Sequence, residues 1–358
     1  MIANMPHFWL SGQLLSESHS KTLLGAHRYS RPGECYDVAT PLSLDLAMAL
    51  TTVVMHKRLA LLSFALVVIR CEVYAQFSDP RTYVNSPVGI NQLELGYAYA
   101  HSNASIDTSI VVAGANFNLN QGIIDYTRYF GFLHRLAWAE AAVPIAGLSG
   151  SIADANISGS ITGTGDSSYA AAILLKGGPA LSVSQFADYK PTTTLGLSFT
   201  FTAPTGLYNS SKLLNLGSDR WSFKPGFALS QPFGPAQKWE FDAYANAYFY
   251  TDNTSYRGVE VLHQQALPGI EGHISYSFND SVWASLDTRY SFRGNTYVNS
   301  VNQNSSQQNF ILGSEVNVSL NARNSLVFQL GKALVHQNGP SITAFAVKYD
   351  YTWGKGYK

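Results

Sequence analysis

The sequence is poor in charged residues, and it lacks any long apolar run. Charged residues make up 13% of its 358 residues, about half the usual share of roughly 25%. Lys plus Arg and Asp plus Glu balance at 23 each, which excludes the basic field that holds nucleic acid. No run of about 18 apolar residues exists, so a membrane-spanning helix is excluded as well. Aromatic residues are plentiful at 13%, and with the low net charge they exclude a disordered chain.

A secretory signal is predicted at residues 55–75. Residues 56–58 (HKR) form a basic region, and residues 59–69 (LALLSFALVVI) form an apolar core. Residues 73–75 (VYA) then fit a small-residue cleavage site. We therefore expect the mature protein to begin at Gln76.

The stretch before this signal is predicted to be no part of the protein. The signal begins at Met55, so residues 1–54 are interpreted as an upstream extension that arises from a misassigned start of translation. The alternative is a genuine N-terminal extension, which is too short to fold alone without cross-links. Both cysteines, Cys35 and Cys71, precede Gln76, so the mature chain has no disulfide framework and no thiolate metal site. The full chain has 23 basic and 23 acidic residues. The mature chain keeps 17 of the basic and 18 of the acidic ones, so it is almost neutral.

From about residue 91 onward the sequence has the two-residue period of β-strands. Residues 194–203 (TLGLSFTFTA) alternate strictly between apolar and small polar residues, over the length that a tilted strand needs to cross the hydrocarbon. Thirteen segments are candidate strands, near 91–101, 108–118, 121–130, 134–145, 169–177, 192–204, 220–231, 238–250, 268–278, 281–292, 308–320, 324–334 and 342–353.

The connections between these candidates alternate in length, as they do in a membrane barrel with turns on one side and loops on the other. The connections at 279–280 and 322–324 are short. The longer ones are rich in Gly, Ser and Asn and lie at 147–168, 208–219, 252–263 and 294–308. Closure with both ends on one side needs an even number of strands. We therefore predict that residues 76–358 form a single all-β domain, a transmembrane antiparallel β-barrel of about 12 strands.

The alternative fold is a secreted β-sandwich, which is also built from alternating strands. Candidate strands of about 10–12 residues are long for a sandwich. Aromatic residues also stand at the ends of the apolar faces, as Trp239, Phe249, Trp221 and Phe223 do, which is typical of the girdles of a membrane barrel. Both observations favour the barrel.

Several stretches resemble a known outer-membrane family. They are residues 202–234 (TAPTGLYNSSKLLNLGSDRWSFKPGFALSQPFG), 249–253 (FYTDN), 283–287 (WASLD), 87–91 (PVGIN) and 351–354 (YTWG). Together they are similar to the transporter-type family described as "putative MetA-pathway of phenol degradation", over about residues 79–353. The resemblance implies an outer-membrane barrel that passes small hydrophobic or aromatic compounds, and it implies no catalytic residue. The chain departs from the common pattern in which the last strand ends on a terminal aromatic residue, because Trp353 is followed by residues 354–358.

The inward face of the predicted barrel carries the candidate functional residues. Ten side chains are expected to line the lumen and a solute path: Glu240, Asp242, Tyr244, Tyr248, Glu271, His273, Trp283, Asp287, Arg289 and Glu315. They have two interpretations. They either fill a closed lumen as paired charges, or they form a narrow channel in which rings contact apolar solutes and charged groups set selectivity.

The sequence offers little for catalysis, so we predict no enzyme. The mature chain has five histidines, none at metal-ligand spacing from another, and no nucleotide-binding motif, so neither a metal nor a cofactor is expected. A barrel-embedded lipid hydrolase would need a serine beside a histidine. His273 and Ser275 lie two positions apart on one strand, about 6.6 Å, which is too far for a direct bond.

The connection at 208–221 carries leucines around Lys212, Asp219 and Arg220. A loop that carries leucines must fold onto something, so it either constricts the pore or packs over a neighbouring strand.

We therefore expect passive passage of small hydrophobic or aromatic solutes through a barrel in the bacterial outer membrane, with outer-membrane lipid and a small hydrophobic solute as its partners. The alternative is a structural or adhesive surface barrel with a closed lumen and long Ser- and Asn-rich loops.

Overall fold

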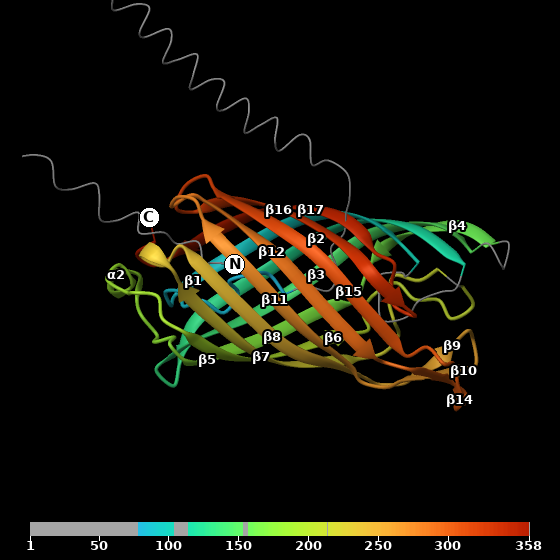
Figure 1. Ribbon diagram of the computed structural model, residues 1–358. Helices are drawn as coiled ribbons and strands as arrows, with labels where there is room; N and C mark the ends of the chain where they lie inside the picture. The colour runs from blue at the N-terminus through green and yellow to red at the C-terminus, as the bar shows by residue number, and fades with distance from the viewer. Residues whose placement is uncertain (1–77, 104–113, 153–156, 213, 358) are drawn as a thin grey trace, which may run out of the picture. The chain divides into compact units, whose positions relative to one another are not determined.

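The computed structural model of the protein describes residues 78–103, 114–152, 157–212 and 214–357 (Figure 1). The predicted signal at 55–75, the predicted extension at 1–54 and the predicted mature start at Gln76 lie outside these residues. The described part is almost wholly β-structure. Twelve long strands form the barrel: β1 (Ile90–Ser102), β2 (Ala115–Phe132), β3 (Arg135–Ile152), β5 (Ser167–Lys176), β6 (Thr194–Ala203), β7 (Ser222–Phe233), β8 (Trp239–Tyr250), β11 (Leu267–Ser277), β12 (Val282–Arg293), β15 (Gln307–Ser319), β16 (Asn324–Gln337) and β17 (Thr343–Gly354).

The barrel closes between its first and last strands. β1 pairs antiparallel with β17 from Ile90↔Gly354 to His101↔Thr343, and on its other side it pairs with β2. Every further barrel strand pairs antiparallel with its neighbours in chain order, through to β17. A closed barrel satisfies its backbone hydrogen bonds without a free edge, which is what the bilayer demands. The predicted all-β transmembrane barrel of about 12 strands is confirmed.

Two of the thirteen candidate strands belong to one strand of the structure. The segments 108–118 and 121–130 were predicted as two strands, but β2 runs unbroken from Ala115 to Phe132, and residues 108–113 lie outside the described part. The polar residues at this division, Asn118 and Asn120, lie on the outer face of the strand. There Asn118 accepts a hydrogen bond from the Tyr99 hydroxyl at 2.8 Å, and Asn120 accepts one from Tyr97 at 2.7 Å.

Three of the predicted long loops contain short strands. β3 extends to Ile152, and β4 (Ile157–Thr164) pairs back onto it. A separate four-stranded sheet is built from β9 (Asn253–Tyr256), β10 (Glu260–Gln264), β13 (Thr296–Val298) and β14 (Val301–Asn302). Composition rich in Gly, Ser and Asn indicated turns here, but the pairing of each stretch with its neighbour overrides that tendency.

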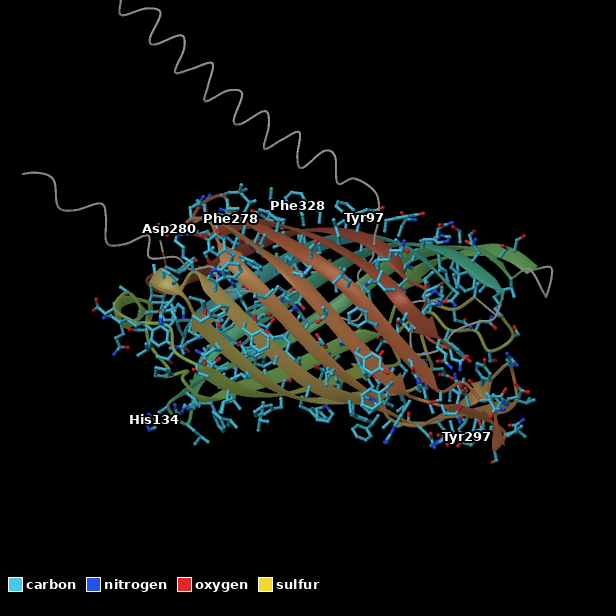
Figure 2. All side chains as sticks on the ribbon, in the orientation of Figure 1. Tyr97, His134, Phe278, Asp280, Tyr297 and Phe328 are labelled. Atoms are coloured by element: carbon cyan, nitrogen blue, oxygen red, sulfur yellow. The ribbon has the colours of Figure 1, made fainter. Side chains whose placement is uncertain are left out.

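The two ends of the barrel differ in their connections. Phe278 and Asp280 lie at the end with the short turns, and Tyr297 lies at the opposite end, beside β9, β10 and β14 (Figure 2). By the usual asymmetry of outer-membrane barrels, the short turns mark the periplasmic side. The connection from β5 to β6 is the longest on this side and contains the short helix α2 (Val183–Phe186), while a 3-10 turn at Pro235–Gln237 precedes β8. None of the helices in the described residues is long and apolar enough to span a membrane.

Side chains alternate between the outer and the inner face. On β6, Leu197 and Phe199 are 44% and 47% exposed on the outside, whereas Thr194 is buried inside. Aromatic clusters stand at both ends of the outer face. Trp239 stacks with Phe233 and contacts Tyr276 near the periplasmic turns, and at the opposite end Phe201 contacts Trp221. These clusters match the interfacial girdles that the sequence indicated.

Candidate functional site

The periplasmic half of the lumen is occupied by residues 78–89, which we call the N-terminal segment. The backbone nitrogen of Val88 donates to the carbonyl of Leu181 at 2.8 Å, at the periplasmic connection that follows β5. Further in, the Thr194 hydroxyl donates to the carbonyl of Tyr83 at 2.7 Å. The backbone nitrogen of Ser78 donates to Oε2 of Glu271 at 2.6 Å. Ser78 therefore lies inside the lumen, and the segment runs from there to Val88 at the periplasmic mouth.

Arg81 fixes this segment to the barrel wall. Its backbone nitrogen donates to Oδ2 of Asp242 at 3.0 Å, and its Nε donates to the Ser275 hydroxyl at 2.7 Å. Its Nη1 donates to the Ser277 hydroxyl at 3.1 Å, and its guanidinium lies 4.7 Å from the ring centre of Trp283. The other carboxylate oxygen of Asp242 accepts from the Ser230 hydroxyl. The described lumen at the level of Asp242 is thus filled by the protein's own chain.

Asp79 ties the segment to the opposite wall. Its Oδ2 lies 2.9 Å from Nζ of Lys348 on β17, and its Oδ1 accepts from Nε2 of Gln329 on β16 at 2.8 Å. Lys348 also lies 3.2 Å from Glu94, and Gln329 also donates to Glu315. Asp79 is therefore a buried counter-charge for Lys348 and joins the N-terminal segment to β16 and β17.

Deeper in the lumen, two charged pairs lie on β11 and β12. Nη1 of Arg289 lies 2.6 Å from Oε1 of Glu271, which also accepts from Nδ2 of Asn246 at 2.8 Å. Nδ1 of His273 lies 2.9 Å from Oδ1 of Asp287. Both pairs are buried. The antiparallel pairing of β11 with β12 places Glu271 directly opposite Arg289 and His273 directly opposite Asp287.

The structure places all ten predicted side chains on the inner face. Nine are buried and Tyr248 is partly buried. The structure joins Glu271, His273, Asp287 and Arg289 into neighbouring pairs and gathers Asp242, Tyr244 and Trp283 around the N-terminal segment. Glu315 is linked to that segment through Gln329, and Glu240 is buried two positions from Asp242 on β8. That these residues line a solute path remains a prediction.

Ser275 and His273 have separate partners in the structure. The Ser275 hydroxyl accepts its bond from Arg81, and the ring of His273 is turned toward Asp287 and, 5.0 Å between ring centres, toward Tyr244. Among the described residues, no group of three or more His, Cys, Asp and Glu side chains could hold a metal ion.

The extracellular half of the lumen has a different character, which the sequence reading missed. Buried apolar residues from six barrel strands and two loops meet there, and we call them the apolar cluster: Ala100, Phe117, Leu119, Ala146, Leu148, Ile152, Leu216, Ile311, Ala333, Ile342 and Ala344. The signal was missed because on β2 the inward Phe117 and Leu119 are apolar and the outward Asn118 is polar, the reverse of the pattern expected for a membrane strand. Barrel lumens are commonly polar, so this lining is informative.

The loop at 208–221 folds into this mouth. Leu216 is only 2% exposed within the apolar cluster, and Leu214 packs against it, so these two leucines lie inside this mouth. Asp166 anchors the loop by accepting hydrogen bonds from the backbone nitrogens of Gly206 and Ser218, each at 2.8 Å. Arg220 donates to Gln264 at 2.8 Å and lies 4.1 Å from the ring centre of Tyr250.

The N-terminal segment and two lumen lysines were also missed. Asp79 and Arg81 precede the first strand, so no strand period marks them as lumen residues. Lys224 and Lys348 could have been found, because each stands between outward apolar or aromatic neighbours and therefore falls on the inner face.

Comparison with known proteins gives a family and a fold. A family model described as "Putative MetA-pathway of phenol degradation" matches residues 100–349. The crystal structure of an outer membrane channel from Pseudomonas putida F1 is similar with a TM-score of 0.66 and 23% identity, covering 77% of this chain and 100% of that chain. The KdgM porin with disordered oligogalacturonate follows at a TM-score of 0.40 and 9% identity, covering 73% and 99%. The CymD monoaromatic hydrocarbon channel has a TM-score of 0.38 and 9% identity, covering 75% and 89%. No curated protein matches the chain.

Proposed function

The chain belongs to the family described as "Putative MetA-pathway of phenol degradation", and on that premise we propose that its barrel passively conducts small hydrophobic or aromatic solutes across the bacterial outer membrane. The observation that carries this proposal is the apolar cluster inside the extracellular half of the lumen. A water-filled pore for polar solutes would be lined by polar groups, whereas an apolar lining favours the entry of apolar molecules.

The ten inward residues take part in this proposal as the lining of the path on β8, β11, β12 and β15. Rings such as Tyr244, Tyr248 and Trp283 offer apolar faces, and Asp242, Asp287 and Arg289 surround them with fixed charge. Passage past Asp242 requires the N-terminal segment to yield, because Arg81 occupies that level. The energy for this comes from thermal motion and the solute gradient, and the proposal needs neither a cofactor nor a catalytic group.

Uptake into vesicles tests the proposal. Purified protein is reconstituted into vesicles with lipopolysaccharide in the outer leaflet, and the initial entry of phenol-like and fatty solutes is compared with that into vesicles without protein. Faster entry with the barrel, changed by Asp242→Asn or Arg289→Met, supports the proposal. Entry at the rate of empty vesicles for every solute refutes it.

A second candidate is a structural or adhesive surface barrel with a closed lumen. The filling of the periplasmic half by the N-terminal segment favours it, as does the separate sheet of β9, β10, β13 and β14, where Val259 and Val301 are 89% and 65% exposed. The same uptake measurement separates the two candidates, since a closed barrel admits no solute in any of the variants.

A further inference from the structure

Lys224 faces the lumen from β7. It lies on the same face as Ala228 and Ser230, which are each 1% exposed, while Phe227 on the other face is 46% exposed to the outside. Lys224 is nevertheless only partly buried. Solvent therefore reaches this side chain inside the barrel, in contrast to the buried carboxylates farther down the lumen.

Its amino group has no charged partner among the described residues. The other lumen cations are engaged: Arg289 with Glu271 at 2.6 Å, Lys348 with Asp79 at 2.9 Å, and Arg81 with two serine hydroxyls. Nζ of Lys224 instead lies 5.3 Å from the ring centre of Tyr248. A cation–π contact compensates only part of the desolvation of an ammonium group.

Around the ring of Tyr248, two cations share the carboxylate of Glu271. The guanidinium of Arg289 lies 6.0 Å from the centre of the same Tyr248 ring, so the ring stands between two cations. The nearest carboxylate of that group, Glu271, is already paired with Arg289. A cation that is partly removed from water and lacks a counter-charge is a favourable place for an anion to bind.

The apolar cluster begins at the same height. Counted from the periplasmic end of each strand, Lys224 is nine positions up β7 from Phe233. In the cluster, Ile311 is eight positions up β15 from Ser319, and Ala344 is ten positions up β17 from Gly354. Equal counts on strands of equal rise place these residues at similar depths. In the order of the barrel strands β7 stands opposite β1 and β17, so Lys224 and these cluster residues face each other across the lumen. A molecule that spans the lumen at this depth meets both the ammonium group and the apolar cluster.

We propose that Lys224 binds the anionic head group, a carboxylate or a phenolate, of solutes whose hydrocarbon or aromatic body lies in the apolar cluster. This inference rests on the proposed function and narrows its substrate class from apolar solutes in general to apolar anions. The head group would pair with Nζ of Lys224 on the side away from the ring of Tyr248, and the body would replace water against Ile311 and Ala344.

Equilibrium binding tests this assignment. The purified barrel in lipid nanodiscs is titrated with 4-tert-butylbenzoate and with 4-tert-butylbenzamide, which has the same shape and no charge. We expect the carboxylate to bind about tenfold more tightly, as one charge-assisted contact provides. Lys224→Met should abolish this preference and leave the affinity for the amide unchanged, while Lys224→Arg should retain it. Ionised 4-nitrophenol compared with 4-nitrotoluene shows whether a phenolate is accepted as well.

Lys332→Met is the matched control, because Lys332 lies exposed on β16. It should keep the tenfold preference. Equal binding of the acid and the amide by the unaltered protein, or a preference that survives Lys224→Met, overturns the head-group proposal and leaves the proposed function standing. Absence of binding for both compounds also overturns the head-group proposal, whereas the uptake measurement decides the proposed function.

Discussion

Asp242 on β8 accepts a hydrogen bond at 3.0 Å from the backbone nitrogen of Arg81, a residue 161 positions earlier in the chain. The contact joins the barrel wall to the N-terminal segment, and the side chain of Arg81 adds bonds to Ser275 and Ser277 on the next strand. The periplasmic half of the lumen is therefore narrowed by the start of the described chain, and the properties of the pore depend on how firmly that segment is held.

Loss of the Arg81 side chain should widen the pore. Arg81→Ala removes two hydrogen bonds to β11 and the contact with Trp283, while the backbone bond to Asp242 can persist. We expect the ionic conductance of single barrels in planar bilayers to rise severalfold. Arg135→Ala, at the periplasmic start of β3, is the control and should leave conductance as it is. Identical conductance in all three proteins would mean that Arg81 does not restrict the pore.

The buried pair on β11 and β12 should be costly to break from one side. Arg289→Met leaves the carboxylate of Glu271 buried without its cation, so we expect a loss of about 3–5 kcal/mol in unfolding free energy. The double variant Arg289→Met with Glu271→Gln should recover most of that loss, because no uncompensated charge remains. Urea unfolding from lipid vesicles provides both values, and an additive double variant would show that the two groups do not interact.

The two faces of β6 should respond differently to charge. Phe199→Arg puts a guanidinium against the hydrocarbon and should cost about 2–4 kcal/mol, as at a bilayer midplane. Thr200→Arg, one position along, points into the lumen and should cost far less. Folding titrations in vesicles measure both variants side by side. Equal losses would mean that the inner and outer faces have been exchanged, as a slip of one residue would do.

The mature protein should begin at Gln76. Cleavage after Ala75 leaves two residues before Ser78, whose backbone nitrogen is bonded to Glu271 inside the lumen. A short, free amino terminus suits that position. Intact mass of protein taken from its native outer membrane decides the point, and a species that retains any residue before Met55 would refute the predicted translation start.

Much of the fold could be predicted because strand period is a local property. The alternation around Phe199 and around Asp242 fixed which residues face lipid and which face the lumen. By contrast, the prediction divided β2 between residues 118 and 121. The hydrogen bonds that Asn118 and Asn120 accept from Tyr99 and Tyr97 depend on the pairing of β2 with β1, which the local period does not reveal.

The candidate site could be predicted only where its residues follow the two-residue period of the strands. The lumen side chains of β8, β11 and β12 follow from alternation, so Glu271 and Arg289 were found. The role of Arg81 was not, because it depends on a chain segment that folds back into the barrel with no period of its own. The position of Leu216 also depends on tertiary contacts, because Asp166 anchors the loop that carries it. From the sequence, this loop could either constrict the pore or pack over a neighbouring strand.

Photoaffinity labelling locates the solute path most directly. A small aromatic solute that carries a diazirine is irradiated with the barrel in its membrane, and the labelled residues are identified by mass spectrometry. A path through the lumen predicts labels on Leu119, Leu148 and Leu216, which an excess of unlabelled aromatic solute suppresses. Labels confined to lipid-facing residues such as Ile124 and Phe199, with none in the apolar cluster, would contradict passage through this barrel.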